Sequence, residues 1–188
     1  MEQSEYQSFQ VEHKKTKNRR RPLILLPLII LGILILVAPA FIYFFVARPF
    51  VVSGNSMTPA FVNGQKFIIN VGRALPAHGK IVVVNSPSDH KAYIRRIIAI
   101  PGDTIMVKNG NVYLNGYILN ESLYLTPGTK TFGGTFLKDG VTLKLPPDEY
   151  FVMADNRSSG KDSRDWGFVK TGDIIGTLGK CYSNCSSK

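Results

Sequence analysis

Hydrophobic positions divide the chain into one long apolar run and a series of short ones. The long run extends over residues 22–47, holds 26 residues and contains no charged side chain. About 20 apolar residues in a helix cross the hydrocarbon core of a bilayer. Six basic residues precede it, from Lys14 to Arg21, and such residues stay on the cytoplasmic side. The pattern predicts a cytoplasmic basic tail over residues 1–21, a transmembrane helix over 22–47 and an extracytoplasmic domain over 48–188.

A cleavable signal peptide is the alternative interpretation of this run. Ala38-Pro39-Ala40 has the small residues of a cleavage site. The apolar region of a secretory signal is only about 7–15 residues long, whereas this run continues through residues 41–46. We therefore favour a retained anchor with the main domain on the outer face of the cell membrane.

Beyond residue 48, short β-branched runs alternate with clusters of Gly, Pro and Asn, which is typical of a mainly β, antiparallel domain. Strands are predicted over residues 66–71, 80–84, 93–100, 104–107, 111–114, 149–153 and 173–178. Asn109-Gly110 predicts a hairpin turn. Residues 109–147 are assigned to an excursion from the main sheet, and its Gly-, Thr- and Pro-rich part over 119–147 is predicted to be irregular.

Charge and cysteine content change this picture little. The net charge is +10, which favours anionic membrane lipids or cell-wall polymers as partners. Nucleic acid is not expected, because the domain lies outside the cell and the basic residues form no recognisable binding motif. An external location permits a disulfide between Cys181 and Cys185, and free thiols remain equally possible. The three histidines match no zinc spacing, so neither a metal nor a cofactor is predicted.

The stretch Ser53-Gly54-Asn55-Ser56-Met57-Thr58-Pro59 follows the long apolar run. Glycine allows a positive φ and proline fixes φ, so the serine between them lies on a tight, irregular segment. Such a turn can expose a hydroxyl group and leave nearby N–H groups free to bind a carbonyl oxygen. A plain polar turn would give the same local pattern.

Four stretches, taken in order, resemble the sequence boxes of type I signal peptidases, the membrane-bound serine proteases that remove leader peptides. They are residues 53–59, 79–84, 93–103 and 154–167. The resemblance extends over nearly all of residues 22–180. It implies coiled antiparallel β-sheets on the outer membrane surface. It also implies a cleft that takes a secreted preprotein as an added strand, with small side chains one and three residues before the cut.

In this family a serine attacks the scissile carbonyl and a neutral lysine accepts its proton. Ser56 matches the nucleophile, and the resemblance places Ser53, Gly54, Met57 and Pro59 at the cleft. The position of the lysine is occupied by Arg95, whose guanidinium stays protonated and has no lone pair to act as a base.

The last box departs from the family pattern as well. Gly160 stands where the family has a serine that orients the lysine, while Ala154 and Lys80 replace a glycine and an acid. The remaining matches are expected to brace the site through charge-assisted hydrogen bonds. They are Asp155, Asn156, Arg157, Asp162, Ser163 and Arg164.

Two functions are compatible with these residues. The first is a signal-peptidase-like protein with little hydrolytic activity that assists surface-protein or pilus assembly in Gram-positive bacteria, with preproteins or pilus subunits as partners. The second is an active serine endopeptidase that cleaves after Ala-x-Ala with Ser56 and a displaced base. Lys80, His90 and Lys91 are near in sequence, but the sequence places none of them against Ser56.

Overall fold

The structure is a computed structural model that describes residues 21–72 and 76–185. The chain separates into two units, Met1–Phe41 and Ile42–Lys188. Of the predicted basic tail, residues 1–20 lie outside the described residues.

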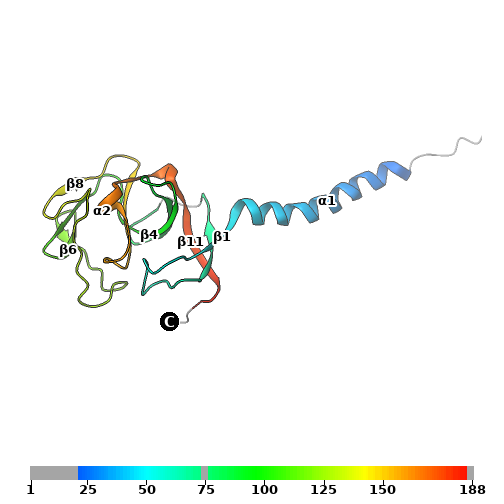
Figure 1. The fold of residues 1–188 in the computed structure, drawn as a ribbon. Helices are drawn as coiled ribbons and strands as arrows, with labels where there is room; N and C mark the ends of the chain where they lie inside the picture. The colour runs from blue at the N-terminus through cyan, green and yellow to red at the C-terminus, as the bar shows by residue number, and fades with distance from the viewer. Residues whose placement is uncertain (1–20, 73–75, 186–188) are drawn as a thin grey trace, which may run out of the picture. The chain divides into compact units, whose positions relative to one another are not determined.

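Helix α1 (Arg21–Val46) forms where the long apolar run was found, and it contains Pro27 and Pro39 (Figure 1). Within the described part of the chain, no helix is both long and apolar enough to cross a membrane. The transmembrane span over residues 22–47 therefore stays a prediction.

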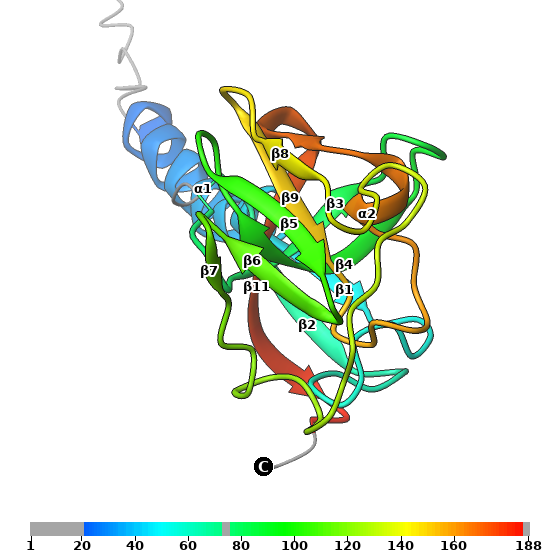
Figure 2. The same cartoon turned by 90° about the vertical axis from the view of Figure 1, so that its left-hand side faces the viewer.

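Two antiparallel sheets make up the second unit (Figures 1 and 2). The seven-stranded sheet has the order β1-β2-β11-β3-β4-β9-β10, and the four-stranded sheet has the order β7-β6-β5-β8. The strands of the first are β1 (Ala47–Val51), β2 (Lys66–Asn70), β11 (Ile174–Ser183), β3 (Ile81–Asn85), β4 (Ala92–Ala99), β9 (Glu149–Met153) and β10 (Val169–Lys170). Those of the second are β7 (Tyr117–Ile118), β6 (Asn111–Leu114), β5 (Thr104–Lys108) and β8 (Thr142–Lys144).

The antiparallel β architecture predicted from the sequence is confirmed, and all seven predicted strands are present. Two segment assignments were wrong. The stretch predicted to be irregular, residues 119–147, contains β8, and the whole excursion over residues 109–147 supplies β6, β7 and β8 to the second sheet. The segment Arg48-Pro49-Phe50, for which no strand was predicted, belongs to β1, where Phe50 lies opposite Phe67 of β2. The short helix α2 (Ser163–Trp166) was not predicted.

A buried hydrophobic cluster joins the two sheets. It includes Ile98 and Phe151 from the large sheet and Ile105, Val107 and Val112 from the small one. Complete burial of such side chains stabilises a fold by about 1.5–3 kcal/mol each. The second sheet is therefore an integral part of the domain and fixes the loops that follow it.

A second cluster lies under the Ser53–Pro59 turn. Val52 and Met57 are 4% and 1% exposed, and they pack with Phe67, Val83 and Ile94. Because successive side chains of a strand point to opposite faces, Arg95 and Arg96 leave β4 on opposite sides. Ile94 therefore contributes to this cluster, while its neighbour Arg95 is available to a different surface.

The two cysteines form a disulfide at the end of β11. Asn184, inside the five-residue loop that the disulfide closes, donates from Nδ2 to the carbonyl of Gly64 at 3.1 Å. The N–H of Gly64 in turn donates to the carbonyl of Val52 at 2.8 Å. The disulfide loop is thus tied to the segment that leads into the Ser53–Pro59 turn.

Candidate active site

Ser56 lies on a turn, here called the nucleophile turn (residues 53–59), that leaves β1 and crosses the second cluster. Gly54 has a φ of +83°, and its N–H donates to Oδ1 of Asn63 at 3.0 Å. The buried Met57 side chain anchors the turn from below. Asn156 holds it from the side, because its N–H donates to the carbonyl of Ser56 at 2.9 Å. The Ser56 side chain is half-buried.

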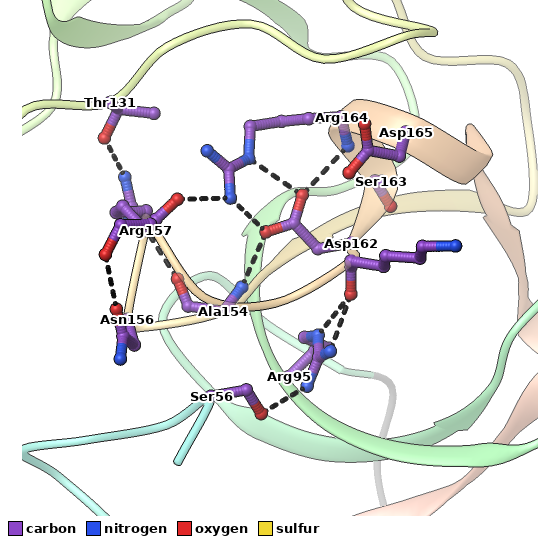
Figure 3. Close-up of polar contacts among 12 residues, drawn as sticks. Ser56, Arg95, Thr131, Ala154, Asn156, Arg157, Asp162, Ser163, Arg164 and Asp165 are labelled. Carbon is purple, nitrogen blue, oxygen red and sulfur yellow. Dashed lines mark hydrogen bonds and ion pairs between the residues drawn. The ribbon is translucent and has the colours of Figure 1, made fainter. Parts of the chain in front are cut away.

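Arg95 of β4 supplies the polar partner of the Ser56 hydroxyl. Its Nη1 donates to Ser56 Oγ at 3.0 Å, as Figure 3 shows. Nε and Nη2 donate to the carbonyl of Lys161 at 3.0 and 2.6 Å, and Nη1 also donates to the carbonyl of Ile94. The guanidinium carbon lies 5.0 Å from the centre of the Tyr93 ring and 5.6 Å from that of Trp166.

The charge of Arg95 is buried, and no carboxylate of the described residues pairs with it directly. The residue is 2% exposed, and burial lowers the pKa of its guanidinium, while Asp162 and Tyr93 oppose that shift. Four hydrogen bonds to oxygen and two aromatic faces compensate the lost hydration. Each of these hydrogen bonds uses an N–H donor of Arg95. The group has no acceptor for the proton of Ser56.

Gly160 leaves the space that this arrangement needs. A Cβ atom added at residue 160 would lie 3.0 Å from Cβ of Ser56, 3.1 Å from Cβ of Ala154 and 3.5 Å from Nη2 of Arg95. The first two contacts are tighter than ordinary van der Waals contacts between carbon atoms. Glycine at 160 is therefore required sterically by Ser56 and Ala154, while the 3.5 Å distance to Arg95 is an ordinary contact that makes residues 95 and 160 neighbours.

The loop that carries Gly160 is braced at its start by Asp155. This carboxylate accepts from Nε and Nη2 of Arg96 at 2.8 and 2.6 Å, and its side chain is fully buried. Arg96 also stacks on the ring of Tyr124, with 4.0 Å between the guanidinium carbon and the ring centre. The excursion that contains Tyr124 is thereby attached to the strand that carries Arg95.

A second brace is formed by Arg157. Its Nε donates to the carbonyl of Ala154 at 3.0 Å, and its Nη1 donates to Thr131 at 2.6 Å. Both terminal nitrogens bind the carboxylate of Glu121, which forms a buried ion pair with Arg157. This guanidinium joins the excursion to the loop of residues 154–160.

The third brace centres on Asp162, which caps α2. Its Oδ2 accepts from the N–H of Ala154 at 2.9 Å and from Arg164 Nη2 at 2.8 Å, as Figure 3 shows. Its Oδ1 accepts from the N–H and Nε of Arg164. Ser163 Oγ accepts from the N–H of Val152 at 3.1 Å. Polar residues that a solvated turn would expose are here buried and hydrogen-bonded.

The structure brings Ser56, Arg95 and Gly160 together and surrounds them with the residues of the last box. The other predicted candidates for a base behave differently: Lys80, His90 and Lys91 are exposed. Among the described residues, Arg95 makes the only side-chain hydrogen bond to Ser56 Oγ. No group of three or more His, Cys, Asp or Glu side chains in the described residues could hold a metal ion.

The partners of the three braces were not predicted from the sequence. Arg96 could have been found, because strand alternation puts it on the opposite face from Arg95. Glu121, Tyr124 and Thr131 come from the irregular excursion, where no periodic pattern signals which side chains turn inward. The carbonyl of Lys161 is a backbone group and leaves no trace in the sequence.

The chain matches the sequence family described as "Signal peptidase, peptidase S26" over residues 24–182. It is 37% identical over 142 residues to the probable signal peptidase I-2 of Synechocystis sp., covering 70% of this chain and 61% of that protein. It is 37% identical over 139 residues to signal peptidase I P of Bacillus subtilis subsp. natto, covering 70% and 75%. A crystal structure of a signal peptidase I from Enterococcus faecalis aligns at 27% identity and a TM-score of 0.46, covering 56% of this chain and 98% of that one.

Proposed function

Because the chain belongs to the signal peptidase family, peptidase S26, we propose that it is a membrane-anchored, peptide-binding relative of the signal peptidases with impaired hydrolytic activity. The observation that carries this proposal is the 3.0 Å hydrogen bond from the guanidinium of Arg95 to Ser56 Oγ. The partner of the serine is a proton donor, whereas attack on a peptide carbonyl requires a proton acceptor.

The size of the impairment follows from the chemistry. Loss of a general base alone reduces the rate about 10²–10⁴-fold. Where the base also generates the nucleophile, removing one member can cost on the order of 10⁶-fold, as in serine proteases. The positive charge of Arg95 stabilises a serine alkoxide, but the proton must still leave for solvent. We therefore expect slow turnover at neutral pH.

The intact braces around Ser56 favour a role that needs the cleft but not the chemistry. Buried charge-assisted pairs such as Arg96 with Asp155 and Arg164 with Asp162 keep the loop beside Ser56 in place. We propose that the domain, anchored by residues 22–47, acts on the outer face of a Gram-positive membrane. There it binds secreted or surface preproteins or pilus subunits as an accessory or chaperone during assembly.

Active leader peptidase is the second candidate, and one observation favours it. Ser56 is present, and its backbone N–H donates to no acceptor in the described part of the chain. A free N–H beside a serine can bind the oxyanion of a tetrahedral intermediate. This function needs a base other than Arg95 that reaches Ser56 only when substrate is bound.

Incubation of the detergent-solubilised full chain with an Ala-x-Ala precursor separates the two candidates. We expect negligible cleavage by the natural chain, retained precursor binding, and at best partial recovery of cleavage in Arg95→Lys/Gly160→Ser. Ser56→Ala serves as the matched control for cleavage. Rapid processing by the natural chain that disappears in Ser56→Ala would establish the enzyme and refute the impaired function.

A further inference from the structure

Two cavities lie side by side along the loop of residues 154–160. The first has a volume of about 400 Å³ and reaches Thr58 and Pro59 of the nucleophile turn. The second has a volume of about 290 Å³ and reaches Gly160. Lys130, Arg157 and Ser158 line both, so the cavities are neighbours. The volume of the first cavity lies within the range of about 300–1,000 Å³ that is usual for small-molecule sites.

The charges of the first cavity are satisfied with one exception. Asp155 is paired with Arg96, and Arg157 is paired with Glu121. Lys130 is exposed, and its ammonium makes no hydrogen bond or ion pair with the described residues. The remaining lining residues are uncharged: Pro59, the amide of Asn156 and the hydroxyl residues Thr58, Thr126, Thr129 and Ser158. The first cavity therefore presents one unpaired positive charge among neutral hydrogen-bonding groups.

The stem of Lys130 is not free in solvent. A Cβ atom added at Gly110 would lie 2.6 Å from Lys130 Cδ, so the aliphatic stem lies directly over the β5–β6 hairpin turn. The N–H of the next residue, Thr131, donates to the carbonyl of Gly110 at 3.0 Å. Figure 3 shows Thr131 pointing toward Arg157, which lines both cavities. The backbone at Lys130 is thus fixed at the cavity wall.

From this arrangement we infer that Lys130 is a specificity-determining residue that selects an extended peptide with an acidic side chain near its Ala-x-Ala sequence. The inference rests on the proposed peptide-binding function and names one property of the peptide. The acidic side chain pairs with the ammonium of Lys130 in the first cavity, and the peptide backbone meets the surrounding hydroxyl and amide groups. A neutral or basic side chain at the same place leaves Lys130 unpaired.

Fluorescence anisotropy with the full chain in detergent tests this inference. The probes are fluorescein-labelled peptides that carry Ala-x-Ala, in which each of six flanking positions is in turn Glu, Gln or Lys. We expect one position or two adjacent ones where Glu binds about two- to five-fold more tightly than Gln, the range of a partly exposed ion pair. Lys130→Gln should abolish the difference, and Lys130→Glu should reverse it in favour of Lys.

Lys144→Gln is the matched control, because Lys144 is an exposed lysine on β8 that lines neither cavity. Binding without charge preference, or a preference that Lys130→Gln leaves intact, would overturn this inference alone. Binding of no peptide would overturn it together with the proposed peptide-binding function. Mass spectrometry of the same samples detects cleavage, and rapid cleavage with a Lys130-dependent preference would refute only the impaired hydrolysis.

Discussion

The contact between residues 95 and 160 yields the sharpest prediction. A Cβ at residue 160 would stand 3.0 Å from Ser56 Cβ and 3.5 Å from Arg95 Nη2. Gly160→Ser alone should therefore overpack the site and reduce the free energy of unfolding by about 1–3 kcal/mol. Arg95→Lys alone removes both donors to the carbonyl of Lys161, which should cost about 1–3 kcal/mol.

The two changes should not add. In the double variant, the lysine at residue 95 leaves the space of the Arg95 guanidinium group empty. The hydroxyl of a serine at residue 160 can then accept a hydrogen bond from the lysine ammonium. The double variant should therefore be more stable than the sum of the single effects, with a favourable coupling of about 0.5 kcal/mol or more. Since the contacts of residue 160 with Ser56 and Ala154 remain, recovery to the stability of the natural chain is not expected.

Urea unfolding of the full chain in detergent measures this coupling. Trp166 is the single tryptophan and lies 5.6 Å from the guanidinium of Arg95, so its fluorescence reports on the site itself. Gly172→Ser is the control, because a Cβ at Gly172 would meet no atom within 4 Å. Additivity of the two single effects to within about 0.5 kcal/mol would refute the expected coupling between residues 95 and 160.

Three further predictions concern the surroundings of the site. Glu121→Gln leaves the buried charge of Arg157 without its carboxylate, so urea unfolding should show a loss of about 3 kcal/mol or more; a change below 1 kcal/mol would contradict the brace. Burial raises the pKa of Asp103, but hydrogen bonds from two amides and an imidazole outweigh it and hold that pKa below its ordinary value. Asp103 therefore stabilises the fold at pH values above its unfolded pKa of about 3.9, and this contribution is lost as pH falls through the lower folded pKa. Asp103→Asn should make the free energy of unfolding depend less steeply on pH at acidic pH. An unchanged dependence would exclude the effect. Reduction of the disulfide between Cys181 and Cys185 should accelerate amide hydrogen exchange in residues 53–64, and identical exchange in both redox states would show that the disulfide loop does not restrain the nucleophile turn.

Local signals in the sequence account for most of the fold. All seven strands predicted from β-branched runs are present in the structure. Asn109 and Gly110 adopt positive φ values of 53° and 78°, as a tight hairpin turn requires. Strand β8 was missed because its three residues are recognisable only through their pairing with β5, about forty residues away. Strand β1 was missed because it follows directly on the apolar run, and only its register with β2 separates the two elements.

The site was predictable only in part, for a related reason. The four boxes identify Ser56, Arg95 and the residues of the last box by position. What Arg95 does depends on its burial, on the carbonyl of Lys161 and on the hydroxyl of Ser56 being within reach of its guanidinium. None of these is a property of a single position, and each arises only when segments far apart in sequence are packed together.

The retention of Ser56 follows from the same packing and does not require catalysis. Its Oγ accepts a hydrogen bond from the guanidinium of Arg95, a residue that is 2% exposed and pairs directly with no carboxylate in the part of the chain that the structure describes. Alanine at this position would leave a buried, charged N–H donor without an acceptor, at a cost of about 1–3 kcal/mol or more. A loss of biological function in Ser56→Ala is therefore expected whether or not Ser56 is a nucleophile. Direct detection of the cleaved peptide, rather than the phenotype of this variant, is what distinguishes a protease from a peptide-binding relative.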